Sequence, residues 1–283
     1  MISSELDAWI PEKISRSRIE KCRGGFSVYS ICLKNDDLAG KSIFFFSDLH
    51  LRSEKVRSFF PSFHAWSGSG HVQEILLDAL TRFPADFVIF GGDLISEAVW
   101  FDRAFELLKS LPGKFKLAVN GNWDIHRCCS LRAPELWRSR YREAGFQLLL
   151  NEKISPGNGI SFFGMDDSKS GMMVLPSEQD FSPGDFRVLI THNPDAVPRL
   201  KTLPDLILCG HTHGGQCRLP AYGAIKTSCV YGKKFEFGAY RHKENGTLML
   251  VSAGIGCSFL RLRLFCPPQA YHIRFEKEDR NGG

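Results

Sequence analysis

The chain has 283 residues, of which 43% are hydrophobic and 24% are charged, a composition that excludes disordered and fibrous proteins and supplies enough apolar residues for a buried core. The net charge of +5 fits an anionic substrate but, without a concentrated basic stripe, does not indicate a nucleic-acid-binding protein. No apolar run approaches the roughly 18 residues of a membrane span, and residues 1–7 lack the basic and apolar regions of a secretory signal. Nine cysteines without regular spacing indicate reduced thiols, so we expect a cytoplasmic protein.

Short apolar runs alternate along the first half of the chain with segments whose hydrophobic residues recur at helical spacing. The expected strands are residues 26–31 at a sheet edge, and residues 43–46, 87–90, 115–119, 146–150, 160–163, 186–190, 205–209, 248–252 and 271–275. The expected helices are residues 72–83, residues 101–111 and a third helix that contains Leu136, Trp137, Tyr141 and Ala144. This alternation predicts an α/β fold with a layered core and helices outside.

Five of the expected strands end in Asp, Asn or His next to glycine or proline. Ligands of α/β folds bind in the loops beyond the carboxyl ends of the strands. His211 and His213 are two residues apart, as are Asp48 and His50, and in an extended segment this spacing points both side chains the same way. We therefore expect the polar strand ends to meet around one ligand site.

The polar residues at these strand ends form a set that suits divalent metal ions. The candidates are Asp48, His50, Asp93, Asn122, His192, His211 and His213. Oxygen and imidazole ligands without cysteine suit manganese, iron, cobalt or zinc. Seven ligands are too many for one ion and enough for two, which in phosphoryl transfer lie about 3.5–4 Å apart. The set can meet only within one domain, so we expect a single domain over residues 1–283, with its core at about residues 26–275.

The order of these motifs resembles the calcineurin-like metallophosphoesterase superfamily. The matching motifs are Asp48-x-His50, Gly91-Gly92-Asp93, Gly121-Asn122, His192 and Gly210-His211-x-His213, and the resemblance extends over residues 43–275. It implies a four-layered sandwich of two mixed β-sheets flanked by helices, holding two divalent ions, with manganese expected and iron, zinc or cobalt as alternatives.

The resemblance also implies a division of the ligands. Asp48, His50 and His213 would hold one ion, Asn122, His192 and His211 the other, and Asp93 would bridge. The implied reaction is in-line attack on phosphorus by a metal-bridging hydroxide, to which Asp93, Asn122 and His211 contribute as ligands.

Further motifs look like the YkuE/YaeI-type phosphodiesterase branch, which includes membrane-associated bacterial enzymes. These motifs are Gly214-Gly215-Gln216, Asn193-Pro194-Asp195 and Gly254-Ile255-Gly256 with Arg263 and Pro267-Pro268. One member type of this branch is the chlamydial UDP-2,3-diacylglucosamine pyrophosphatase of lipid A biosynthesis. The resemblance implies hydrolysis of UDP-2,3-diacylglucosamine to UMP and 2,3-diacylglucosamine 1-phosphate, with peripheral contact at the cytoplasmic face of the inner membrane. The alternatives are a phosphodiesterase or phosphatase on nucleotides or other phospholipid headgroups, or a non-catalytic scaffold; neither a nucleic acid nor a protein partner is expected.

Trp123 departs from the superfamily pattern, since most members have histidine after the metal-binding asparagine. An indole cannot exchange a proton in acid–base catalysis, although its N–H can donate a hydrogen bond. Three interpretations follow: the enzyme is inactive, His126 replaces the missing acid, or the leaving group needs no strong acid. We prefer the third, because a phosphate leaving from a pyrophosphate meets that condition, and related lipid A enzymes of other bacteria also lack histidine there.

Two further features are candidates for substrate binding. Phe59 and Phe60, with Phe63 and Trp66, lie in a loop with basic neighbours, and they either fold back into the core or form an acyl-chain groove or membrane-dipping lid. Arg263 is a candidate for binding a substrate phosphate, for which the guanidinium fork is suited.

Overall fold

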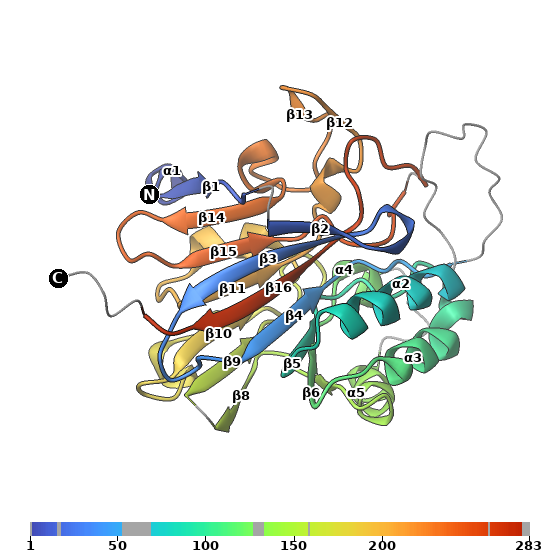
Figure 1. Cartoon of the computed structure of the whole chain (residues 1–283), viewed down its shortest axis with the longest axis horizontal. Helices are drawn as coiled ribbons and strands as arrows, with labels where there is room; N and C mark the ends of the chain where they lie inside the picture. Colours follow the sequence, from blue (N-terminus) through green and yellow to red (C-terminus); the bar gives the residue numbers. More distant parts are fainter. Residues whose placement is uncertain are drawn as a thin grey trace.

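Two seven-stranded mixed sheets form the centre of the fold in the computed structural model (Figure 1). The structure describes residues 2–15, 18–52, 69–126, 133–157, 159–259 and 261–278. The α/β prediction with two mixed sheets and flanking helices is confirmed.

The first sheet carries the early apolar runs of the chain. Its strands, in spatial order, are β2 (Ile19–Lys21), β3 (Ser27–Lys34), β16 (Gln269–Glu276), β4 (Ser42–Phe46), β5 (Phe87–Phe90), β6 (Phe115–Ala118) and β7 (Gln147–Leu148). Strands β4 to β7 are parallel, and β16 is antiparallel to β4. The expected edge position of residues 26–31 is wrong: β3 lies inside the sheet, because β2 pairs with one side and β16 pairs with the other over eight residues.

The second sheet faces the first. Its strands, in spatial order, are β1 (Trp9–Glu12), β14 (Gly238–His242), β15 (Leu248–Val251), β11 (Leu206–Cys209), β10 (Phe186–Ile190), β9 (Ile160–Gly164) and β8 (Glu152–Gly157). The central strands β9, β10, β11 and β15 are parallel, whereas β14 and β8 are antiparallel to their inner neighbours.

Hydrophobic residues fill three spaces between layers. On β4, Ile43 and Phe45 point into the space between the sheets, whereas Phe44 and Phe46 point towards the helices, which explains why this strand is apolar throughout. The helices α2 (Ser69–Arg82), α3 (Phe101–Ser110) and α5 (Pro134–Glu143) cover the outer face of the first sheet (Figure 1). The outer face of the second sheet packs against α1 (Ile2–Asp7), the 3-10 turns η6 (Pro194–Arg199) and η8 (Gly232–Phe235), and Phe181, which follows the 3-10 turn η5 (Glu178–Asp180).

Short elements complete the chain beyond the strand ends. They are η3 (Ala98–Trp100), α4 (Asn122–His126), η7 (His213–Gly215) and the hairpin of β12 (Arg218–Leu219) and β13 (Gly223–Ala224). The hairpin projects from the body of the molecule at the top of Figure 1. None of the helices in the described ranges combines the length and the apolar composition needed to cross a bilayer. The expectation of one domain stays a prediction.

Candidate metal centre

The candidate ligands follow the C-terminal ends of β4, β5, β6, β10 and β11, which lie at the same end of the two sheets. Their backbone is turned rather than extended, so the argument from extended spacing is wrong for both residue pairs. Five candidates have positive φ angles, and they make up most of the nine such non-glycine residues in the described chain: Asp48 at 55°, His50 at 46°, Asp93 at 59°, His211 at 71° and His213 at 51°. Left-handed backbone is uncommon for such residues and concentrates at functional sites.

Four buried side chains form a first ligand group, with one donor atom of each within 4.8 Å of the others: Asp48, His50, Asp93 and His213. The Nε2 atoms of His50 and His213 are 2.9 Å apart. His50 Nε2 lies 3.3 Å from Asp93 Oδ2, and His213 Nε2 lies 3.4 Å from Asp48 Oδ1. The first sheet supplies three of these residues, and the second sheet supplies His213.

A second ligand group shares Asp93 with the first and adds His192 and His211. His192 Nε2 lies 3.3 Å from the same Asp93 Oδ2 that faces His50, and His211 Nδ1 lies 3.3 Å from His192 Nε2. The two histidines of the Gly210–Gly215 turn therefore belong to different groups. The histidines and Asp48 divide as the resemblance implied, and Asp93 is common to both groups; the assignment of these residues and of Asn122 to two ions stays a prediction.

Asn122 is the first residue of α4, and its surroundings test whether the site suits metal ions. Its loop is held against Asp93, because the Trp123 backbone N–H donates to Asp93 Oδ1 at 2.8 Å. The buried Asn122 Oδ1 accepts no hydrogen bond from any described residue. A buried amide oxygen without a donor is costly, and a divalent cation would satisfy it. The donor set therefore fits a pair of divalent ions.

Neighbouring groups fix the ligand rings in place. His192 Nδ1 lies 2.7 Å from the Gly91 carbonyl oxygen and donates to it, which leaves Nε2 free to act as a ligand. His50 Nδ1 lies 3.0 Å from the Ser96 hydroxyl. Neither partner was predicted from the sequence: a backbone carbonyl carries no residue signal, and Ser96 lies three residues beyond its motif.

Asp124 is a hydrogen-bond acceptor for the loops and is absent from both ligand groups. Its buried carboxylate accepts the backbone N–H groups of Asp93 and Leu94 at 2.8 Å and of Gly121 at 2.9 Å. One side chain thereby ties the loop after β5 to the loop after β6, and it holds Asp93 and Asn122 in one place.

The ionisation states follow from burial and from the close pairs. Burial alone would raise the pKa of the Asp93 carboxyl, but the His192 and His50 rings outweigh it and hold that pKa well below its usual range. Burial and the neighbouring His192 lower the pKa of His211 to about 3. Burial, with His50 and Arg263, also lowers the pKa of His213. Burial alone would lower the pKa of His192, but the Asp93 carboxylate outweighs it and raises that pKa well above its usual range. His211 and His213 are therefore neutral, the form in which imidazole binds metals, whereas His192 shares its proton with Asp93 and must lose it when a metal binds.

Glycines allow the loops to approach the carboxylates. A Cβ atom on Gly121 would lie 2.2 Å from Asp93 Oδ1, and one on Gly210 would lie 2.5 Å from Asp48 Oδ2. No side chain larger than hydrogen fits either place, which explains the glycines in the Gly121-Asn122 and Gly210-His211 motifs.

Trp123 lies against the first ligand group. Its ring meets the His50 ring edge to face, with centroids 5.0 Å apart, and it also contacts the Phe259 ring, with centroids 5.2 Å apart. Phe259 is 72% exposed, so this aromatic pair reaches from a candidate ligand to the surface.

The remaining predicted site residues have other surroundings. Arg263 is buried, its Nη2 lies 3.3 Å from His213 Nδ1, and it donates to the carbonyl oxygens of Ala253 and Gly256. These contacts support the His213 loop, and the substrate-binding role of Arg263 stays a prediction. His126 is exposed at the end of α4, and its catalytic role also stays a prediction. Phe59 and Phe60 lie outside the described residues.

The chain has two facing mixed sheets, with carboxylate, amide and imidazole donors at the end where their strands finish. These features define the class of metal-dependent phosphoester hydrolases. Residues 41–215 match the calcineurin-like phosphoesterase family, and the chain belongs to that family. The resemblance found in the motifs is thus confirmed.

The relatives are bacterial. The chain is 30% identical over 194 residues to the uncharacterised metallophosphoesterase YkuE of Bacillus subtilis, covering 65% of each chain. It is 29% identical over 191 residues to the phosphodiesterase YaeI of Escherichia coli, covering 65% of this chain and 68% of YaeI. It is 27% identical over 140 residues to the UDP-2,3-diacylglucosamine pyrophosphatase LpxG of Chlamydia trachomatis, covering 47% of this chain and 42% of LpxG. The match therefore spans less than two thirds of YkuE and less than half of LpxG.

Proposed function

We propose that this phosphoesterase uses two divalent ions, with manganese as the expected metal, to hydrolyse a nucleotide-diphosphate lipid. The substrate that we favour is UDP-2,3-diacylglucosamine, and the products would be UMP and 2,3-diacylglucosamine 1-phosphate. The observation that carries the metal-dependent part is the meeting of two ligand groups at one shared carboxylate, Asp93.

The residues that would hold the ions are those of the two groups together with Asn122. When bound, two such ions supply a nucleophile at neutral pH and neutralise charge on the phosphoryl group. The protein's own contribution is positioning. The Gly91 carbonyl fixes the His192 ring, Ser96 contacts the His50 ring, and the backbone N–H of Trp123 donates to the Asp93 carboxylate.

Trp123 supports a substrate with a good leaving group. Its indole stands beside His50, at the position where most superfamily members carry a histidine, and it cannot protonate a leaving oxygen. A nucleoside monophosphate or sugar phosphate leaves from a pyrophosphate as a stabilised anion and needs no strong acid. The pyrophosphatase name of LpxG adds support, by similarity over part of the chain.

The Trp123 and Phe259 rings also favour a substrate with an apolar part. They form an aromatic surface beside the first ligand group, and Phe259 is accessible to solvent. An acyl chain or a uracil ring could pack there. We also propose that Phe59 and Phe60 contribute to an acyl-chain groove.

The decisive experiment supplies the purified protein with Mn²⁺ and compares UDP-2,3-diacylglucosamine with a soluble aryl phosphodiester. Faster turnover of the lipid, with release of UMP, is the expected result. Turnover of the soluble ester alone would select the alternative, a phosphodiesterase or phosphatase on nucleotides or other headgroups. Failure to bind metal and to hydrolyse either compound would leave a non-catalytic scaffold of this fold.

A further inference from the structure

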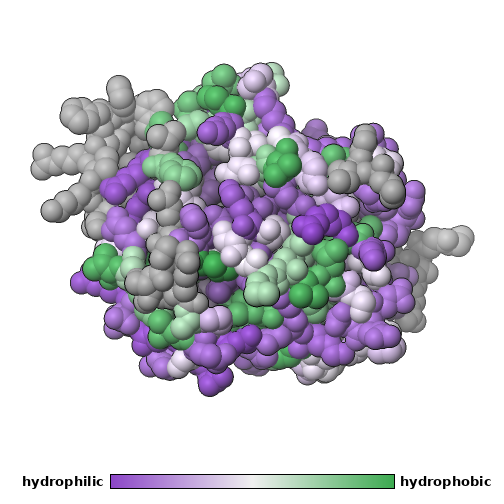
Figure 2. Space-filling model, turned by 180° about the vertical axis from the view of Figure 1, so that it is seen from behind, coloured by the Kyte–Doolittle hydropathy of each residue, from purple (hydrophilic) through white to green (hydrophobic). Residues whose placement is uncertain are grey.

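Exposed hydrophobic side chains gather on one projection of the molecule. The described residues include ten large hydrophobic residues that are exposed, and four of them lie on or beside the β12–β13 hairpin: Leu219, Tyr222, Ile225 and Phe265. The β12–β13 hairpin forms this projection, and Figure 2 shows hydrophobic residues on it, at the top of the molecule. Scattered single hydrophobics are normal on a protein surface, but a cluster of them indicates a binding surface.

Four of these residues define what we call the hairpin surface: Leu219, Tyr222, Ile225 and Phe265. Leu219, Tyr222 and Phe265 line one shallow hollow. Phe265 comes from a distant part of the chain, and it is held beside the hairpin because the Arg218 N–H donates to the Leu264 carbonyl at 2.9 Å. The hairpin surface is therefore built from two segments and is not a single loose loop.

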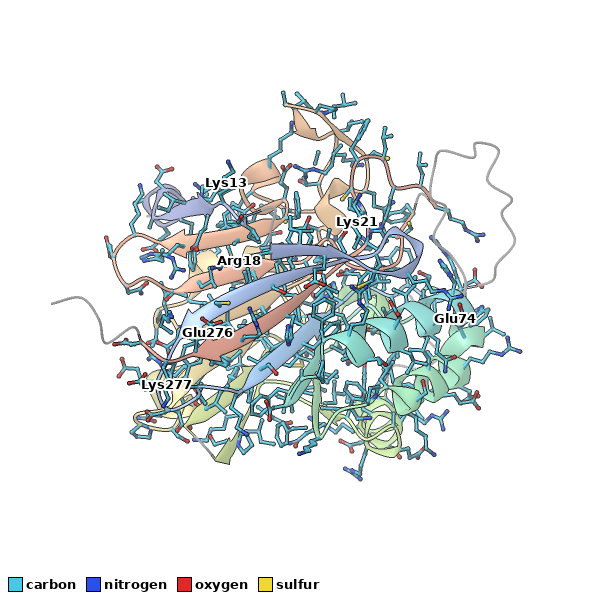
Figure 3. All side chains as sticks on the ribbon, viewed as in Figure 1. Lys13, Arg18, Lys21, Glu74, Glu276 and Lys277 are labelled. Atoms are coloured by element: carbon cyan, nitrogen blue, oxygen red, sulfur yellow. The ribbon has the colours of Figure 1, made fainter. Side chains whose placement is uncertain are left out.

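The chain around the hairpin surface carries more positive than negative charge. Residues 216–235 and 257–268 contain six basic residues and no Asp or Glu: Arg218, Lys226, Lys233, Lys234, Arg261 and Arg263. Glu236 lines the hollow and forms an ion pair with Arg218, so these two charges cancel. Arg263 is buried, which leaves Lys226, Lys233, Lys234 and Arg261 as the accessible positive charges. Elsewhere in the same view acidic and basic side chains are mixed: Figure 3 labels Glu74 and Glu276 as well as Lys13, Arg18, Lys21 and Lys277.

The basic and apolar groups of the hairpin surface are arranged as at a membrane interface. The Lys233 ammonium lies 3.1 Å from the centroid of the Tyr222 ring and donates to the Tyr222 carbonyl. Lysine with aromatic and aliphatic residues is the composition that binds the boundary between acyl chains and anionic headgroups.

The hairpin surface is also attached to the metal centre. Arg218 Nη1 donates to the carbonyl of Gly214, the residue after His213, at 3.0 Å. The thiol of Cys266, next to Phe265, contacts the His213 carbonyl at 3.3 Å. Both segments of the hairpin surface thus contact the loop that supplies His213.

We propose that the hairpin surface inserts into the headgroup region of an anionic lipid bilayer and holds the metal centre beside it. The inference rests on the proposed function in one respect, because a lipid-linked substrate would then be presented at the site. The lipid contact itself rests on apolar exposure and charge, and it can be tested without the substrate.

The test measures sedimentation of the whole protein with phosphatidylcholine vesicles, with and without phosphatidylglycerol. We expect binding to the anionic vesicles that falls about tenfold without the anionic lipid and weakens with salt. The variant Leu219→Ser/Ile225→Ser/Phe265→Ser should lose about tenfold in binding to anionic vesicles. The matched control Met172→Ser/Val174→Ser, which changes exposed hydrophobic residues outside this region, should bind like the wild type.

The outcomes separate this inference from the proposed function. Equal binding by wild type and triple variant, or no binding by the wild type, would overturn the inference. Self-association that only the triple variant loses would instead make the hairpin surface an interface between copies, and would also overturn it. Turnover of a soluble aryl phosphodiester should be the same in all variants, which checks their folding. Vesicle binding without any phosphoester hydrolysis would refute the proposed function and leave this inference standing.

Discussion

Gly121→Ala is the sharpest test of the candidate metal centre. The φ angle of Gly121 is not in the left-handed region, so alanine is free of backbone strain there. Its Cβ atom would lie 2.2 Å from Asp93 Oδ1 and 2.5 Å from the Asp93 backbone nitrogen, whereas real Cβ contacts are not shorter than 3.0 Å. The carboxylate must therefore move by at least 3.0 − 2.2 = 0.8 Å, and the Asp93 backbone must shift with it. Asp93 belongs to both ligand groups, so this shift disturbs both. Displacements of about 1 Å cost roughly 100-fold in rate, and we expect a loss of about this size in kcat/KM.

The assay measures kcat/KM on a soluble aryl phosphodiester together with metal content and thermal melting. Gly246→Ala is the control: its Cβ would touch nothing within 4 Å, but its φ of 75° adds about 1 kcal/mol of backbone strain at the opposite end of the second sheet. The control should melt earlier than the wild type and keep its activity and metal. Wild-type activity and metal content in Gly121→Ala would refute the placement of Asp93 in a shared site.

Four further results are expected. Asp93→Ala and His211→Ala should each abolish hydrolysis and reduce bound metal together, and full activity in either variant would contradict the ligand assignment. Trp123→His should keep much of the wild-type rate on a pyrophosphate substrate, whereas a complete loss would show that the indole contributes to catalysis. Ser96→Ala removes the group 3.0 Å from His50 Nδ1 and should weaken metal binding about tenfold in a metal titration; an unchanged affinity would mean that this contact does not orient the ring. Chelation should lower the melting temperature and Mn²⁺ should restore it, since a ligand at 100 times its Kd adds about 2.7 kcal/mol of stability, and identical melting curves would argue against bound ions.

The central strands could be predicted from the sequence because they are buried on both faces. Runs such as residues 43–46 and 87–90 are wholly apolar, which is typical of strands between two layers. The strands β1, β8 and β14 were not predicted, because they lie at or next to a sheet edge and mix polar with apolar residues. Strands that are far apart in the sequence, such as β3 and β16, also pair, and neither segment carries a sequence pattern that identifies its partner.

The metal centre was predictable in its residues and not in its geometry. Donor side chains follow apolar strands, and this pattern is visible in the sequence. The left-handed backbone of Asp48 and His211 was not predictable, because only a few per cent of non-glycine residues adopt it and tertiary contacts impose it. The His211 N–H, for example, lies 3.1 Å from Asp48 Oδ1, across 163 residues of chain.

Both ligand groups combine residues from the two sheets. Ions bound there would therefore link the two sheets at the C-terminal ends of their central strands. The affinity for metal and the spacing of the sheets then become one linked equilibrium, in which each influences the other by the same free energy. Loss of metal would release the ends of β5 and β10 first, and their amides would exchange hydrogen faster. A substitution at Phe45 or Phe162, in the space between the sheets, would in turn weaken metal binding without touching a ligand.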